Sequence, residues 1–356
     1  MGDIDQFIST SNTADITRVA DRCYDNKLWE ASRILYASIG NNARLASCYV
    51  YLKNLPAALD AAKKAGSPKT WKEVNFACVK AKEFKLAEIA GQHLVVFPEH
   101  LIEIVKVYER YGYPEQLIEL IEKCLGMEGE HVGMYTELGI LYAKHQQTKL
   151  MTHLKTYYQK IDINKVLVTC KKYLLWEEAV FLHAHYDEYD NAIVTMITHS
   201  PSCWKHELFV EYLKKVKNHE LHLQAIQFYL SEDPLELDAL LTATSSVLDI
   251  PKVIGELRRL KCVPLVEKFL CGVQSQDLSV VNDALNEVFL ENQDYSSLRN
   301  SVSQYNNFDQ LGLAKKIETH ELLEFRRIAS FIYRKNKKFG ESLDLSKKDA
   351  MFKVIF

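Results

Sequence analysis

Two short stretches of the sequence combine imidazole and carboxylate side chains, the groups that bind metal ions or transfer protons. One is HAHYDE at residues 183–188, and the other is ELH at residues 220–222. On a helix, residues two apart point about 200° away from each other, so the two histidines of the first stretch cannot share one metal ion, and the glutamate and histidine of the second have the same defect. The spacing therefore argues against a metal site in either stretch.

The remaining groups that could act in catalysis carry no recognisable pattern. The eight cysteines are scattered, and no two of them stand at C-x-x-C spacing. The patterns H-E-x-x-H, G-x-G-x-x-G and G-x-x-x-x-G-K-[ST] are missing from the sequence. No nucleophile signature surrounds any thiol or any of the 12 histidines. We therefore predict buried thiols, surface imidazoles, no cofactor and no enzymatic activity.

Basic side chains gather in short clusters, which leave two interpretations open. They occur at Lys63-Lys64, Lys171-Lys172, Lys214–Lys217, Arg258–Lys261 and Arg334–Lys338. Cations in the last turn of a helix stabilise its exposed carbonyl groups by about 0.3–1 kcal/mol each, which accounts for most of these clusters. Some of them could instead form a basic stripe that receives an acidic helix.

The overall charge excludes one class of partner. The chain has a net charge of −3, from 44 basic and 47 acidic side chains among 356 residues. A stacking platform for nucleic acid needs excess positive charge beside its aromatic rings, so we predict no nucleic-acid partner. The uninterrupted apolar runs are also far too short to span a bilayer.

The elements that position these groups are predicted to be helices throughout. Apolar residues recur at steps of three and four, as in helices, and runs that alternate apolar and polar residues, as in strands, are nearly absent. Residues 101–125 form two such stripes separated at Tyr113-Pro114, which predicts a helical hairpin. In the second helix of each predicted hairpin, a small or aliphatic residue, which we call the anchor, marks the place where two helices pack closely. We place the anchors at Ala31, Ala58, Ala87 and Leu117, so they recur at spacings of 27, 29 and 30 residues. Such a period predicts one continuous α-solenoid over residues 1–356.

The stretch AGSPKTWKEVNFACV, residues 65–79, predicts the start of one of these helices. Ser67 followed by Pro68 fits an N-cap with proline in the first turn, while Thr70 with Glu73 fits a capping box. Trp71 then leads an apolar face with Val74 and Cys78, and Lys72 and Glu73 are expected to point toward solvent.

Eight segments, in order along almost the whole chain, resemble the clathrin heavy chain family in its proximal leg. They are RCYD (22–25), ARLAS (43–47), TWKEVNFACV (70–79), KEFKLAEIAG (82–91), GMYTELGILYAK (133–144), DEYDNAI (187–193), AIQFYL (225–230) and HELLEFRRIA (320–329). The resemblance implies a right-handed α-solenoid of short helical hairpins, similar to a tetratricopeptide superhelix. It also implies a structural role. Legs of this family pack on one another to form the coat of transport vesicles in endocytosis, in the cytoplasm, and meet the membrane only through adaptors bound elsewhere.

The resemblance further implies an acidic partner, the clathrin light chain, held by lysines of the proximal leg. Lys144, at the end of GMYTELGILYAK, matches one such lysine by its motif. A second family lysine, in the turn before Pro234, is replaced by Asp233. From the residues alone, Lys149, Arg258, Arg259 and Lys261 are the candidates to compensate for that loss.

Two further points concern the ends of the chain and an alternative family with the same repeat. The beginning MGD and the end MFKVIF, which stops inside an apolar run, predict a fragment truncated at both ends. The rival is a related coat or tethering subunit of the vacuolar sorting type with the same helical repeat. A subunit of that type would share the hairpins but would not carry TWKEVNFACV and DEYDNAI in this order.

Overall fold

Helices make up all the regular structure of the part of the chain that can be described. The computed structural model describes residues 15–349, and this part contains no strand. The predicted all-α fold of helical repeats is therefore confirmed. None of the helices in this range is long and apolar enough to cross a membrane. The termini MGD and MFKVIF, from which a fragment was predicted, lie outside the described residues.

The chain divides into two compact units, with the boundary between His185 and Tyr186. The continuity of one superhelix over residues 1–356 thus stays a prediction. The first unit contains α2 (Ile16–Asp25), α3 (Trp29–Ser38), α4 (Asn42–Tyr51), α5 (Leu55–Ala65), α6 (Pro68–Ala81), α7 (Phe84–Val95), α8 (Pro98–Tyr111), α9 (Pro114–Cys124), α10 (Val132–His145), α11 (Gln147–Tyr157), the 3-10 turn η1 (Tyr158–Lys160), α12 (Ile163–Lys172) and α13 (Trp176–His185).

The second unit has the same make-up of short helices, with more 3-10 turns between them. It contains α14 (Tyr189–Thr198), α15 (His206–Leu213), α16 (His219–Glu232), η2 (Pro234–Glu236), α17 (Leu237–Thr244), α18 (Ile250–Arg259), η3 (Val263–Val266), α19 (Glu267–Val273), η4 (Gln274–Gln276), α20 (Ser279–Glu291), α21 (Tyr295–Gln304), α22 (Gln310–Ile317), α23 (Leu323–Lys335) and α24 (Phe339–Lys348).

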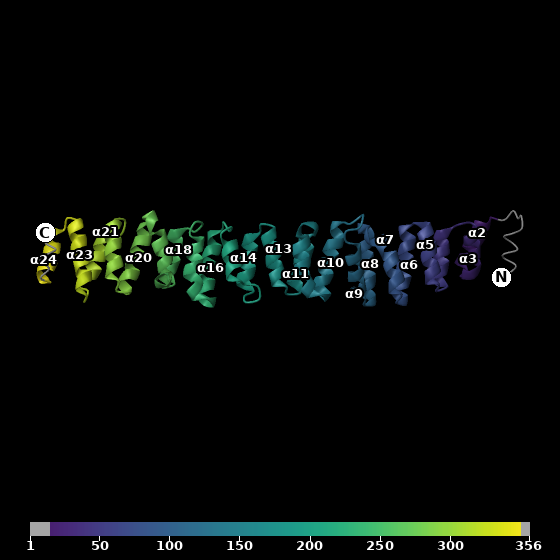
Figure 1. The fold of residues 1–356 in the computed structure, drawn as a ribbon, viewed down its shortest axis with the longest axis horizontal. Coiled ribbons are helices and arrows are strands. Elements are labelled where there is room, and N and C mark those ends of the chain that lie inside the picture. The colour runs from purple at the N-terminus through teal and green to yellow at the C-terminus, as the bar shows by residue number, and fades with distance from the viewer. Residues whose placement is uncertain (1–14, 350–356) are drawn as a thin grey trace. The chain divides into compact units, whose positions relative to one another are not determined.

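Helices pack mainly on close neighbours in the chain, as expected of a helical repeat. In the first unit, α4 contacts both the next helix, α5, and the one after it, α6. The same contact between helices two apart in the chain joins α6 to α8 and α7 to α9. In Figure 1 these helices follow one another in chain order, from purple to blue. One apolar core runs through this unit from Ala46 to Leu182. Because each hairpin is buried by the next, the core is built repeat by repeat.

Many helices end on a left-handed residue that lets the next helix start at once. The N–H of the residue after it donates to the carbonyl five positions earlier, as Leu28 does to Cys23 at 2.9 Å and Asn54 to Tyr49 at 2.9 Å. The left-handed residues of these ends are Lys27, Gly40, Lys53, Lys82, Gly112, Leu174, Lys261, Gln293 and Lys337. This is the Schellman arrangement. Lysine at such a place lies near the negative end of the helix dipole, which supports the helix-end interpretation of the basic clusters.

The predicted hairpin of residues 101–125 is confirmed as α8 and α9, whose C-cap and N-cap are Gly112 and Tyr113. Three of the four anchors, Ala58, Ala87 and Leu117, are fully buried. The fourth is shifted by one residue, because Ser32 is buried and Ala31 only half-buried. The Ser32 hydroxyl donates to the Leu28 carbonyl at 3.0 Å, which lets a polar residue fill the close crossing.

The start of α6 follows only one of the two predicted caps. Ser67 is the N-cap with Pro68 in the first turn, while Thr70 lies inside the helix, so the capping box is wrong. Glu73 instead accepts a hydrogen bond from the Ser47 hydroxyl at 2.6 Å. Trp71 is confirmed in the core and stacks on His93 with ring centroids 4.2 Å apart.

Candidate functional site

Lys144 lies in the last turn of α10 and reaches back to the preceding hairpin. Its Nζ atom is 2.7 Å from Oε1 of Glu109, near the end of α8. The lysine side chain is 26% exposed and the glutamate side chain 34%, so both remain open to a partner. An ammonium group has three donors, and the pair with Glu109 leaves the others for a further acceptor.

Lys149, at the start of α11, joins a second group of charged and polar side chains. Its Nζ atom is 2.9 Å from Oε1 of Glu122, which also accepts a hydrogen bond from the Tyr142 hydroxyl at 2.5 Å. The ammonium lies 5.6 Å from the centre of the Tyr142 ring. Burial alone would raise the pKa of the Glu122 carboxyl, but the bonds from Tyr142 and Lys149 outweigh it and lower the pKa. Glu122 is therefore an anion that competes with any acidic partner.

These pairs belong to a wider pattern of ion pairs between neighbouring hairpins in the first unit. Three further lysines make the same kind of contact, in the pairs Lys72–Glu103, Lys123–Glu88 and Lys160–Glu130. Pairs this exposed contribute roughly 0–1 kcal/mol each and weaken with salt. The carboxylates stand 27 to 35 residues from their lysines, so no local sequence signal could have revealed them.

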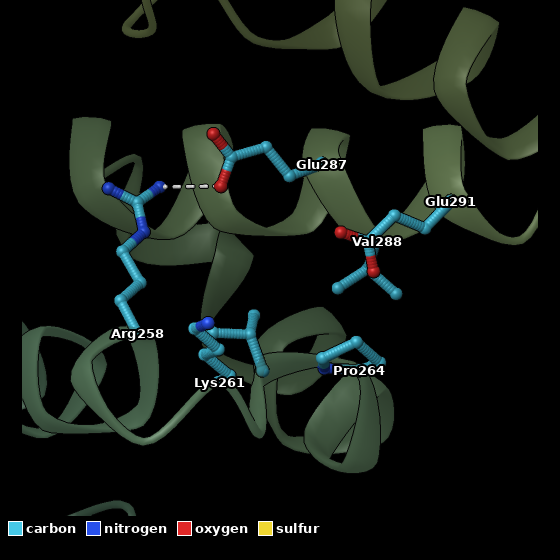
Figure 2. Close-up of a pocket in the computed structure, with 7 residues that line it drawn as sticks. Arg258, Lys261, Pro264, Glu287, Val288 and Glu291 are labelled. Atoms are coloured by element: carbon cyan, nitrogen blue, oxygen red, sulfur yellow. Dashed lines mark hydrogen bonds and ion pairs between the residues drawn. The ribbon is translucent and has the colours of Figure 1, made fainter.

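The candidates in the second unit are also held by carboxylates. Arg258 Nη2 lies 3.2 Å from Oε2 of Glu287 on α20, and Arg259 pairs with Glu256 one turn before it. Figure 2 shows Arg258 directed at Glu287, above the backbone that carries Lys261. Lys261 has a positive φ of 56° and lines a pocket of about 290 Å³ with Glu287 and Glu291. Arg258 and Lys261 thus face an acidic side of α20, whereas Arg259 pairs within α18 and its side chain is 63% exposed.

Asp233, at the position where the resemblance implies a lysine, is the C-cap of α16. Its backbone N–H donates to the Tyr229 carbonyl at 2.8 Å. The side chain puts a negative charge where a cation would serve an acidic partner. The residue after the following proline, Leu235, is 88% exposed.

The histidine stretch does not form a metal site. His183 is buried, whereas His185 Nδ1 lies 2.8 Å from the Phe181 carbonyl and its ring packs on Phe181 and Tyr158. The two imidazoles therefore have different surroundings, as their spacing predicts. Among residues 15–349, no group of three or more His, Cys, Asp or Glu side chains is placed to hold a metal ion.

The prediction about thiols is largely confirmed, and the prediction about imidazoles is wrong at three positions. Six of the eight cysteines are buried, Cys23 is half-buried and Cys271 is exposed. His153, His183 and His222 are buried instead of lying at the surface. His153 Nε2 lies 2.9 Å from the Tyr135 carbonyl, so a histidine fills a core position once a backbone group satisfies it.

Comparisons with a family model and with curated proteins both relate almost the full chain to clathrin. The family model described as "Region in Clathrin and VPS" matches residues 1–86, 94–237 and 241–354. A clathrin heavy chain of Dictyostelium discoideum is 46% identical over 99% of this chain and 21% of its own length. Clathrin heavy chain 1 of Oryza sativa subsp. japonica is 45% identical over 99% of this chain and 21% of its own length. Clathrin heavy chain 2 of Homo sapiens is 42% identical over 99% of this chain and 22% of its own length. This chain therefore spans about a fifth of these relatives.

Likeness to solved structures is weak. A chain of the Naa15/Naa10 complex bound to HypK-THB is 12% identical, with a TM-score of 0.27 over 94% of this chain and 62% of that one. Yeast Tom70 is 11% identical, with a TM-score of 0.21 over 97% of this chain and 92% of its own. Scores this low carry no argument about the fold. The family match and the identity to the clathrin relatives show that this chain belongs to the clathrin heavy chain repeat family.

Proposed function

We propose that this chain is a scaffold segment of a clathrin leg and has no enzymatic activity. In this role it packs on other heavy-chain legs to form the coat of transport vesicles, on the cytoplasmic face of coated pits, in vesicle-mediated transport and endocytosis. The observation that carries the proposal is the 41–46% identity to clathrin heavy chains over 99% of the chain. Short hairpins that each pack on the next support it, because they give a rod with many small contact surfaces.

The second part of the proposal is that the clathrin light chain binds beside Lys144 and Lys149. Both ammonium groups are partly exposed and already bind carboxylates, so an acidic helix offers them ligands of a kind they accept. Tyr142, which packs beside Lys149, adds an aromatic ring to the same surface. Glu109 and Glu122 keep this surface close to neutral in the free chain. Binding then exchanges internal ion pairs for intermolecular ones, which makes it weak in any one contact and sensitive to salt.

Arg258, Arg259 and Lys261 are proposed as a further contact for the light chain, in the second unit. They would compensate for Asp233, which lies in the same unit. Glu287 and Glu291 share the pocket with Arg258 and Lys261 and would repel an acidic helix placed deep in it. A contact at the rim, through the exposed guanidinium group of Arg259, fits this arrangement better.

The test of the light-chain surface is a double charge reversal, Lys144→Glu with Lys149→Glu, measured by isothermal titration with purified light chain. Two exposed contacts worth about 0.2–1 kcal/mol each predict a loss of affinity of roughly 2- to 30-fold at low salt, and a smaller loss at physiological salt. The matched control, Glu109→Gln with Glu122→Gln, frees the same lysines and should hold or raise the affinity. Unchanged binding of the charge-reversed chain at low ionic strength would remove this surface from the proposal.

The rival function is a related coat or tethering subunit of the vacuolar sorting type. The family model covers both classes, and the identity to clathrin heavy chains favours the first. A chain of the rival type would not bind clathrin light chain in the titration above.

A further inference from the structure

A groove in the first unit, away from Lys144 and Lys149, contains cations without a carboxylate partner, unlike the surfaces described so far. It has a volume of about 590 Å³ and lies between the first turns of α4 and α6. Its lining residues come from the end of α2, the start of α4 and the first three turns of α6: Tyr24, Asn41, Ala43, Arg44, Ser47, Lys69, Thr70, Lys72, Glu73 and Phe76. We call it the α4–α6 groove.

Two cations of the α4–α6 groove are not neutralised, unlike those beside α8 and α18. The Arg44 guanidinium lies over the Tyr24 ring, 4.9 Å from its centre. Neither Arg44 nor Lys69 has a carboxylate within ion-pair distance among the residues that the structure describes. The third cation, Lys72, is engaged by Glu103 at 2.6 Å. The groove therefore holds two positive charges that are available to a ligand.

Hydrogen-bond donors in the groove are also unused. The N-cap residue Ser67 gives α6 no side-chain cap, so the N–H groups of its first turn have no side-chain acceptor. Thr70 is only 4% exposed and lines the groove, yet its hydroxyl has no hydrogen-bond partner within residues 15–349. The hydroxyl oxygen itself is not fully buried, so it can donate a hydrogen bond to a ligand that enters the groove. The positive end of the α6 dipole adds to the attraction for an anion.

The other lining groups distinguish a carboxylate from a phosphate. Glu73 lies in the groove, held by the Ser47 hydroxyl at 2.6 Å, and would repel a doubly charged phosphate more strongly than a singly charged carboxylate. Tyr24 and Phe76 are half-buried and offer ring surface beside the cations. An acidic side chain with an apolar neighbour satisfies both features.

We propose that the α4–α6 groove binds an acidic peptide segment of a partner protein, with a carboxylate between Arg44 and Lys69 and an apolar side chain against Phe76. The carboxylate accepts hydrogen bonds from the Thr70 hydroxyl and the first turn of α6. This site is distinct from the light-chain surface proposed above and does not depend on it, because the Lys144 and Lys149 pairs lie on α8 to α11.

The test uses the 356-residue chain and fluorescence anisotropy at low salt. The probes are a fluorescein-labelled peptide of alternating glutamate and leucine, its glutamine–leucine counterpart, and inorganic phosphate as a competitor. The proposal predicts saturable binding of the glutamate peptide, much weaker binding of the glutamine peptide, and little competition by phosphate. Absence of binding, equal binding of the two peptides, or displacement by phosphate at concentrations that match the peptide would each overturn it.

Variants locate the binding. Arg44→Glu with Lys69→Glu should lower the affinity for the glutamate peptide at least about tenfold, and Thr70→Val should lower it about threefold. The matched control is Lys80→Glu with Lys85→Glu, which makes the same charge change at exposed positions of α6 and α7 outside the groove. An equal loss in the control would show non-specific attraction and refute the site. Thermal unfolding of each variant, expected near that of the unmodified chain, ensures that a loss reflects binding.

Discussion

Replacement of Trp71 by alanine tests the packing between hairpins most severely. The Trp71 side chain is 5% exposed, belongs to the core of the first unit and stacks on His93 at an interplanar angle of 18°. Truncation of a buried tryptophan removes its transfer free energy and leaves a cavity, so we expect the free energy of unfolding to fall by about 3–5 kcal/mol. This is a large part of the total for a typical domain, about 5–15 kcal/mol.

The assay is urea unfolding at 25 °C followed by circular dichroism, together with hydrogen exchange measured by mass spectrometry. Because hairpins pack on their neighbours, amides of α5 to α8 should exchange faster in Trp71→Ala while those of α20 to α24 stay unchanged. Trp29→Ala is the matched control. Trp29 is half-buried and stacks on Tyr51, which is 51% exposed, so its loss should cost about 1–2 kcal/mol. A cost below about 1 kcal/mol for Trp71→Ala, or one equal to that of Trp29→Ala, would refute the packing argument.

Two further predictions concern the same unit. In Gly91→Ala, the new Cβ would lie 2.6 Å from Leu120 Cδ2, so we expect a loss of about 1–3 kcal/mol in urea unfolding, whereas Gly255→Ala, with open space around it, should gain about 0.5–1 kcal/mol. Equal effects would contradict the close approach. Burial lowers the pKa of His153 from 6.5, although its hydrogen bond to the Tyr135 carbonyl opposes the shift. The unfolded chain then binds more protons just below pH 6.5, so stability should fall on acidification through that range. His153→Gln should reduce this pH dependence of the urea midpoint, and an unchanged slope would show that other groups cause it.

Much of the fold could be predicted from the sequence because local signals decide it. Proline and glycine mark the ends of α8 and the start of α9, and apolar periodicity identifies the buried faces around Trp71. The errors fall where a polar residue takes over an apolar or solvent position. Ser32 fills a crossing by bonding its own helix, and His153 fills a core position by bonding a backbone carbonyl. Only the tertiary partner makes such a residue acceptable in the interior.

The light-chain site at Lys144 stays a prediction, and the ion pairs that its lysines make could not be predicted from the sequence. The sequence and the family resemblance indicated Lys144, and the structure shows that Glu109 already binds it. The carboxylate comes from a hairpin 35 residues away, and a period of repeats alone does not say which side chains meet across the interface. For the same reason the α4–α6 groove could not be predicted from the sequence, because its cations and donors come together only when α4 and α6 pack.

The proposed role of this chain is that of a clathrin leg segment with a light-chain partner. Its most direct test is isothermal titration of purified clathrin light chain into the unmodified chain at low and physiological salt. The account predicts saturable binding that weakens as salt increases, because charged contacts carry part of the affinity. No binding at low salt would contradict the light-chain role, and binding unaffected by salt would contradict its electrostatic basis.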